Sequence, residues 1–132
     1  LDRCAAIQGH VIELVRCEDG ELSTWLAHAQ ALLFPSFCEG FGMPLVEALM
    51  LGVPVIASDL PAFREISADI PHYLDPLDGL GWQRAVLEYS QADSAARRQQ
   101  MMRMAGYAPP TWAGHFSAVE GLLRSIGVCD AG

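Results

Sequence analysis

Short apolar runs alternate with amphipathic stretches along this chain, and that alternation limits the folds open to it. Strands are predicted for the apolar runs at residues 10–15, 31–36, 53–59 and 71–76. Helices are predicted for the stretches between them, at 19–29, 43–52 and 61–67. Strands that are apolar on both faces and alternate with helices are typical of a parallel sheet. We therefore predict an α/β fold, a Rossmann-like parallel sheet with flanking helices.

The C-terminal half is predicted to be helical. Residues 79–106 form a long helical pattern that is broken near Ala92 to Ser94, and a final helix is expected at about 111–126. Apolar side chains recur with helical spacing in this last segment, and we expect them to belong to the core: Phe116, Val119, Leu122, Leu123 and Ile126.

Length, charge and cysteine content narrow the class of protein. The 132 residues fit one domain or part of one, so residues 1–132 are treated as a single, partial domain. A net charge of −8 argues against a nucleic-acid partner, which needs a basic surface. No apolar window is long enough to predict a membrane span, and we expect a cytoplasmic protein. Scattered cysteines predict reduced thiols and no metal site: Cys4, Cys17, Cys38 and Cys129.

The stretch SFCEGFGMPLVEALMLG, residues 36–52, carries the chemistry. Gly40 and Gly42 allow close approach of a ligand to the backbone, and Pro44 begins a helix whose first N–H groups would be unpaired. A diphosphate placed against the N–H groups from Gly42 to Leu45 would gain hydrogen bonds and the favourable end of the helix dipole. A plain strand-to-helix turn would use the same glycines, and the loop alone does not decide between the two.

Two carboxylates flank this loop. In so apolar a helix, Glu47 is expected to need a hydrogen-bond donor. The vicinal hydroxyls of a ribose would supply two, although an acidic residue near a helix N-terminus is also favoured by the dipole alone. Glu39, on the loop, could bind a sugar hydroxyl in the same way.

The segment from Glu39 to Glu47, with LLFPS before it and LGVPVIASDLPAFREI after it, resembles the Glu-x7-Glu signature of a known enzyme family. This family comprises the retaining, nucleotide-sugar-dependent glycosyltransferases of the two-Rossmann-domain (GT-B) fold, in their glycogen-synthase-like and mannosyltransferase-like group. The resemblance extends from about His10 to about Ile126. It implies a truncated C-terminal, donor-binding domain that works with an N-terminal Rossmann domain absent from this chain.

The resemblance also implies roles for individual residues. Glu47 would hold the ribose of the nucleotide, and Glu39 would contact the donor sugar as the catalytic residue. Backbone amides of the loop would meet the sugar and the diphosphate, with further substrate contacts nearby: Gly40, Phe41, Gly42 and Met43, with Pro44 and Leu45 adjacent. Weaker candidates for binding the base are Val15, Arg16 and Cys17. The resemblance further implies that the transfer step needs no bound metal or other cofactor.

The sequence also suggests a donor for the transfer reaction and leaves two other functional classes open. SDLPAFREI is similar to a stretch of mannosyl- and rhamnosyl-type members, which makes GDP-mannose the first donor to test. The fragment alone is expected to be inactive. A non-catalytic interaction module stays an alternative, as does a glycoside hydrolase using Glu39 and Glu47, although both carboxylates would approach from one side.

The family's strand order predicts that the strands at 10–15 and 31–36 are third and fourth in sequence, and that the first two strands, which this chain lacks, would lie between them in the sheet. We expect either that 10–15 pairs beside 31–36 or that a second copy fills the gap, giving a homodimer through the exposed sheet edge.

Overall fold

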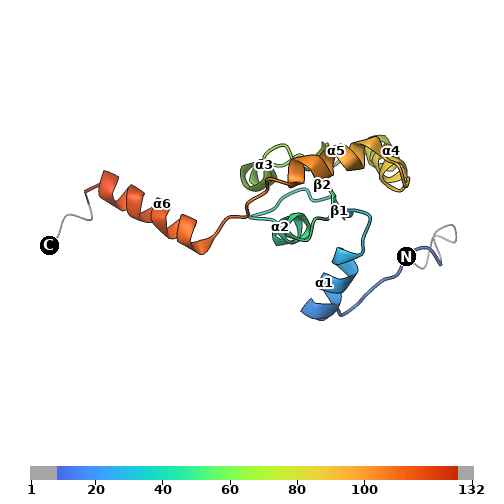
Figure 1. The fold of residues 1–132 in the computed structure, drawn as a ribbon, viewed down its shortest axis with the longest axis horizontal. Coiled ribbons are helices and arrows are strands. Elements are labelled where there is room, and N and C mark those ends of the chain that lie inside the picture. The colour runs from blue at the N-terminus through green and yellow to red at the C-terminus, as the bar shows by residue number, and fades with distance from the viewer. Residues whose placement is uncertain (1–8, 128–132) are drawn as a thin grey trace.

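A three-stranded parallel sheet lies at the centre of the fold. The computed structural model describes residues 9–127. The strands are β1 (Leu32–Phe34), β2 (Val55–Ser58) and β3 (His72–Leu74), in the spatial order β1-β2-β3. Leu33 is in register with Ile56, and Ile56 with His72. Three of the four predicted strands therefore form the sheet, and the predicted α/β class is confirmed (Figure 1).

Helices cover both faces of this sheet. The connections between strands run through α2 (Met43–Met50) and α3 (Pro61–Ser67). Val55 and Ala57 of β2 belong to one buried cluster with side chains of α2 and α3. The intervening residue, Ile56, packs in a second cluster with Ala85 and Tyr89 of α4 (Gly79–Tyr89). Successive residues of β2 thus face two apolar layers, which explains its unbroken apolar sequence.

The expected break in the long helical region is confirmed. α4 ends at Tyr89, and α5 (Ala95–Met104) begins after Ser94. The Ser94 hydroxyl oxygen accepts a hydrogen bond from the Arg97 N–H at 3.1 Å, as an N-cap serine does. Further along α5, the fully buried Gln100 donates from Nε2 to the Val55 carbonyl oxygen at 2.7 Å. This bond fixes α5 to the central strand.

The ends of α2 follow its proline and glycine. Pro44 lies in the first turn, where its missing N–H matters least. At the other end Gly52 has φ +74°, and the Val53 N–H donates to the Ala48 oxygen at 2.8 Å. This pairing closes the last turn of the helix in a Schellman motif, for which glycine is the usual residue.

The strand predicted at 10–15 is wrong, because these residues have no strand partner in the structure. The side chains of Ile12 and Val15 are 71% and 90% exposed. The segment runs toward α1 (Asp19–Ala27) without approaching the sheet (Figure 1). Pairing of 10–15 beside β1 is therefore excluded in this structure. Within residues 9–127, β1 has a strand neighbour only on its β2 side, and a homodimer through its open edge stays a prediction.

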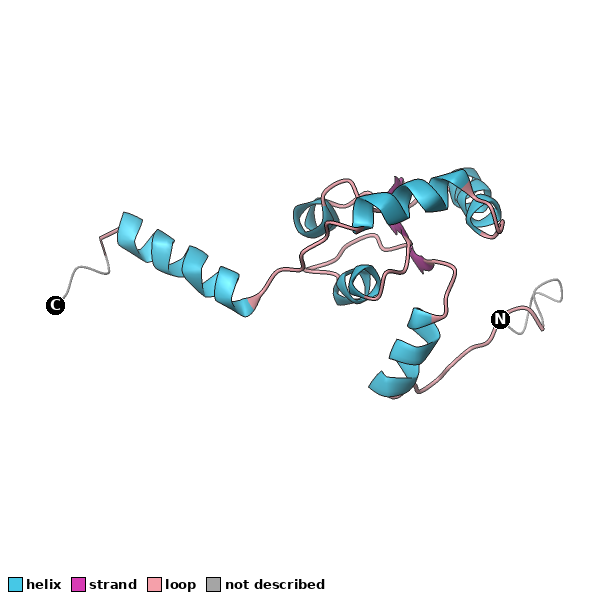
Figure 2. Ribbon diagram, in the orientation of Figure 1, coloured by secondary structure: helices cyan, strands magenta, loops and turns pink. Residues whose placement is uncertain are grey.

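The expected core position of the last helix is also wrong. The helix itself is confirmed as α6 (Trp112–Ser125), but it contains no buried residue. Phe116 and Leu122 are 58% and 60% exposed, and α6 projects away from the other elements (Figure 2). Helical spacing predicts an apolar face, but it does not specify what that face contacts. None of the helices in residues 9–127 has the length and apolar character needed to span a bilayer.

Candidate functional site

The loop from residue 35 to residue 42 links the carboxyl end of β1 to α2. Ligands of open parallel sheets bind at this end of the strands. On the loop, Glu39 is half-buried, and its Oε1 accepts a hydrogen bond from the Ser36 hydroxyl at 2.8 Å. The Glu-x7-Glu motif does not predict that Ser36 is the hydrogen-bond partner of Glu39. The sequence signal that could have indicated it is the serine three residues before the carboxylate. The bond holds the Glu39 side chain across its own loop.

Gly42 makes the turn from the loop into the helix. Its φ of 87° and ψ of 52° lie in the left-handed region, which a residue with a Cβ adopts only under strain. The first turn of α2 then closes on the Gly42 carbonyl, which accepts from the Leu45 N–H at 3.0 Å and the Val46 N–H at 3.4 Å. The left-handed turn at Gly42 therefore sets the direction in which α2 begins.

The set of free N–H donors differs from the expected one. Leu45 is fully buried and its N–H is used within the helix, so the expectation of an unpaired N–H there is corrected. Pro44 has no N–H. In the described part of the chain, the backbone N–H groups of Gly40, Phe41, Gly42 and Met43 donate to no protein acceptor. Gly40, Phe41 and Met43 are exposed and Gly42 is buried. These four consecutive groups, together with the start of α2, are the candidate donors for an anion.

Glu47 is on the solvent side of α2. Leu45, Val46, Ala48 and Leu49 are the buried residues of this helix, and Glu47 is exposed. The idea that Glu47 needs a donor because it is buried is therefore wrong. No side-chain hydrogen bond or ion pair joins Glu47 to another described residue. Its carboxylate is open to a ligand, and its position near the helix N-terminus is also compatible with the dipole alone.

The residues expected near the base lie in an irregular segment. Val15 and Arg16 are exposed and Cys17 is half-buried, all before the start of α1. Their predicted position depended on a strand at 10–15, which is not formed. The structure thus does not bring them to the carboxyl edge of the sheet by the route that the sequence suggested.

The stretch SDLPAFREI spans the end of β2 and most of α3. Arg64 of α3 pairs with both carboxylate oxygens of Asp59, at 2.5 Å from Nε and 2.9 Å from Nη2, and its Nη1 lies 2.6 Å from Asp69 Oδ1. The guanidinium also lies 4.5 Å from the centre of the Tyr73 ring. The hydrogen bond from Arg64 lowers the pKa of Asp59 below its ordinary value. This network ties α3 to the ends of β2 and β3.

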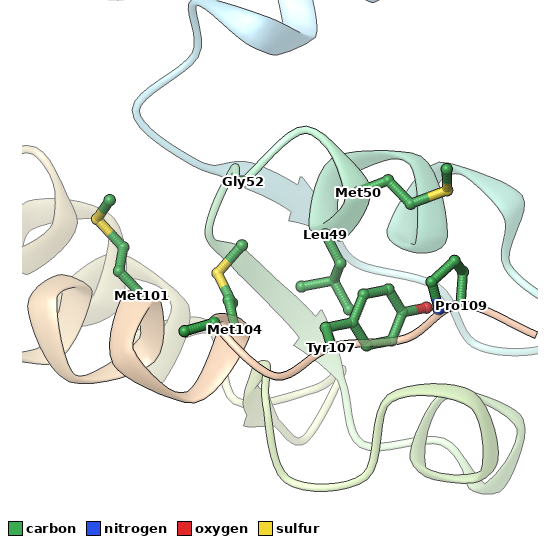
Figure 3. Close-up of a pocket in the computed structure, with 8 residues that line it drawn as sticks. Leu49, Met50, Gly52, Met101, Met104, Tyr107 and Pro109 are labelled. Atoms are coloured by element: carbon green, nitrogen blue, oxygen red, sulfur yellow. The ribbon is translucent and has the colours of Figure 1, made fainter.

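Two surface depressions in the described part of the chain lie away from the loop. One of about 450 Å³ is lined by Leu49, Met50 and Gly52 at the far end of α2 and by Met101 and Met104 of α5 (Figure 3). Another, of about 520 Å³, lies where α4 meets α5. In residues 9–127, no group of three or more His, Cys, Asp or Glu residues is placed to hold a metal ion. Cys4 and Cys129 lie outside the described residues.

A parallel sheet with an open, glycine-turned loop before a helix defines a Rossmann-like protein with a candidate anion site at its strand ends. Comparison with known proteins identifies the family to which the chain belongs. The model of the family described as glycosyl transferases group 1 matches residues 4–70, about half of the chain. The chain therefore belongs to this family, and the match contains β1, the loop, α2, β2 and α3. The sequence-based prediction of a glycosyltransferase is confirmed at this level.

Several curated relatives are named as mannosyltransferases. The chain is 40% identical over 78 residues to the O-antigen chain mannosyltransferase RfbU of Salmonella typhimurium, covering 59% of this chain and 22% of that protein. It is 34% identical over 87 residues to the O-antigen chain mannosyltransferase B of Escherichia coli, covering 66% of this chain and 23% of that protein. The MMP alpha-(1->4)-mannosyltransferase of Mycolicibacterium hassiacum is 44% identical over 48 residues, which are 36% of this chain and 12% of that protein. The chain spans less than a quarter of the length of these relatives.

Proposed function

We propose that this chain is the donor-binding part of a retaining glycosyltransferase that transfers mannose from a nucleoside diphosphate to an acceptor hydroxyl. The supporting observation is the coincidence of the family match with the loop at the end of β1, where four consecutive N–H groups lack protein acceptors. The names of the relatives favour mannose, and GDP-mannose is the first donor to test.

In this proposal the loop binds the diphosphate and the sugar. The leaving diphosphate gains negative charge as the sugar becomes oxocarbenium-like. Backbone donors at fixed positions stabilise such charge because they need little rearrangement during the reaction. The N–H groups from Gly40 to Met43 and the N-terminal end of α2 supply that field without a metal or other cofactor.

In this proposal the two glutamates bind different parts of the donor. Glu47, exposed on α2, accepts hydrogen bonds from the ribose hydroxyls. Glu39, held by Ser36, is the residue next to the donor sugar and the proposed catalytic group. In this proposal the second wall of the binding site belongs to an N-terminal domain in the full-length protein, and the two depressions described above, which lie elsewhere, take no part in donor binding. The fragment alone is then inactive, and we propose that the protein acts in the cytoplasm.

The test is calorimetric measurement of the binding of GDP-, UDP- and ADP-sugars, and of the corresponding free nucleoside diphosphates, to the full-length protein. Replacing Glu47 with alanine should weaken binding of both ligands at least about tenfold, because each charged hydrogen bond is worth about 1.5–3 kcal/mol. Glu39→Ala should weaken binding of the sugar nucleotide and spare the free diphosphate. Glu88→Gln, an exposed change on α4, is the matched control and should leave both affinities unchanged.

Each other outcome counts against a part of the proposal. Unchanged affinity in Glu47→Ala removes the ribose role, and equal losses of both ligands in Glu39→Ala remove the sugar role. Release of free sugar by the full-length protein without any nucleotide donor favours the glycoside hydrolase. Binding without transfer to any acceptor favours the non-catalytic module.

A further inference from the structure

Phe63 of α3 lies directly beneath the turn at Gly42. A Cβ built on Gly42 would be 2.4 Å from Phe63 Cε1 and 2.9 Å from Cδ1, so the ring is in contact with the backbone of the loop. The same ring stacks on Phe34, the last residue of β1, with centroids 5.1 Å apart. Phe63 thus contacts both ends of the segment that carries the candidate site.

The ring is itself held in place. Phe63 is fully buried, so it reaches neither solvent nor a ligand bound over the loop. The next residue, Arg64, fixes α3 through its bonds to Asp59 and Asp69. One turn later the Ser67 hydroxyl lies 2.9 Å from the Tyr73 hydroxyl of β3. α3 is therefore attached to β2 and β3 independently of the loop that it supports.

The loop has few other supports. Its N–H groups from Gly40 to Met43 have no protein acceptor in the described residues, and its side-chain bond, from Ser36 to Glu39, lies within the loop itself. We infer that the packing of Gly42 on this rigid aromatic ring fixes the position of the loop relative to the sheet. A side chain that locks a binding group in this way acts on function through geometry.

We propose that Phe63 is a positioning residue for the donor-binding loop, which holds the Gly40–Met43 N–H groups and Glu39 in register with Glu47. This inference rests on the proposed function for its ligand, a nucleoside diphosphate sugar. It assigns a role in that site to α3, which contributes no group to the ligand. Glu47 lies on α2, so loss of the Phe63 contact disturbs diphosphate and sugar binding more than ribose binding.

The test compares Phe63→Leu with Ile56→Val in the full-length protein. Ile56 is equally buried but packs on the other face of the sheet, so it is a matched control for loss of core volume. The first readout is the affinity for GDP-mannose and for the nucleoside alone. Phe63→Leu should weaken GDP-mannose binding about tenfold or more, as misplaced binding groups do, and leave nucleoside binding unchanged. Ile56→Val should change neither.

The second readout is amide hydrogen exchange within α2, which does not depend on a ligand. The Leu45 and Val46 N–H groups bond to the Gly42 oxygen, and the Val53 N–H bonds to Ala48 at the opposite end of the helix. Phe63→Leu should speed exchange at Leu45 and Val46 and leave Val53 unchanged. If Phe63→Leu does not fold, Phe63→Met, whose unbranched and flexible side chain fills the space left by the ring more adaptably, takes its place with the same expected results.

Two exchange results overturn the inference: unchanged exchange at Leu45 and Val46, or equally faster exchange at Val53, which would mean general destabilisation. Equal loss of GDP-mannose and nucleoside binding overturns it as well. Failure of the wild-type protein to bind any nucleoside diphosphate sugar refutes the proposed function instead. The exchange measurement then decides the positioning role by itself.

Discussion

Replacing Gly42 with alanine should reduce stability more than the same change at Gly52, although both glycines have positive φ. The angles are +87° at Gly42 and +74° at Gly52. Alanine in the left-handed region costs about 1–2 kcal/mol at either position, because its Cβ approaches the following carbonyl oxygen. Backbone strain alone therefore predicts similar losses for the two variants.

The surroundings of the two glycines separate the variants. A Cβ at Gly52 meets no atom within 4 Å, whereas a Cβ at Gly42 lies 2.4 Å from the Phe63 ring, far inside the 3.0 Å that real Cβ atoms keep. Phe63 is stacked on Phe34 and fully buried, so its ring has little room to move. Overpacking of a rigid core costs about 1–3 kcal/mol. We expect Gly42→Ala to lose about 2–5 kcal/mol in total and Gly52→Ala only the strain, about 1–2 kcal/mol.

Equilibrium urea unfolding of the full chain, followed by circular dichroism, measures both free energies of unfolding. The comparison is valid if the m-values of the variants agree with that of the wild type. Equal losses in the two variants would show that Phe63 moves aside freely. That result would refute the argument that a tightly packed ring fixes the loop.

Three further predictions concern other parts of the fold. Burial lowers the pKa of His72, so the unfolded chain binds a proton more readily than the folded one between the two pKa values, and stability falls as pH drops below about 6.5. The melting temperature should fall between pH 7.5 and pH 5.5, and it should fall less in His72→Gln than in the wild type. Gln100→Leu should lower the free energy of unfolding by about 1–2 kcal/mol, because the Val55 oxygen loses its buried donor, and Gln100→Glu should lower it more. Arg64→Lys should lower the melting temperature, because a lysine cannot make the two parallel bonds to Asp59. The control Arg84→Lys, on α4, should leave the melting temperature unchanged. Equal melting temperatures of the two variants would contradict a structural role for the Arg64–Asp59 pair.

The elements that could be predicted from sequence are those with local physical causes. Pro44 and Gly52 bound α2 because one lacks an N–H and the other tolerates a positive φ. Ser94 marks the break between α4 and α5 because its hydroxyl caps a helix. The turn at Gly42 is likewise predictable from the amino-acid sequence, because glycine adopts a left-handed conformation without strain.

The elements that were mispredicted depend on partners. Residues 10–15 have the apolar pattern of a strand, but a strand forms only beside another strand, and none pairs with them here. α6 has the apolar face of a core helix without a described partner, and Glu47 lies on the exposed side of a helix with an apolar sequence. The contact of Phe63 with Gly42 joins residues 21 positions apart, and no periodicity in the sequence encodes it. The site roles of Glu39, Glu47 and the loop amides stay predictions.

The connectivity of the sheet has a consequence for the order of folding. β1, α2, β2, α3 and β3 follow one another from Leu32 to Leu74, and each strand pairs with the next strand in the sequence. Closing such short loops is entropically cheap, whereas the Gln100–Val55 bond joins residues 45 positions apart. We therefore expect the β1–β3 unit to form the folding nucleus and α5 to dock afterwards. Substitutions such as Val55→Ala, whose side chain packs against α2 and α3 within this unit, should then slow folding, and Gln100→Leu should mainly speed unfolding.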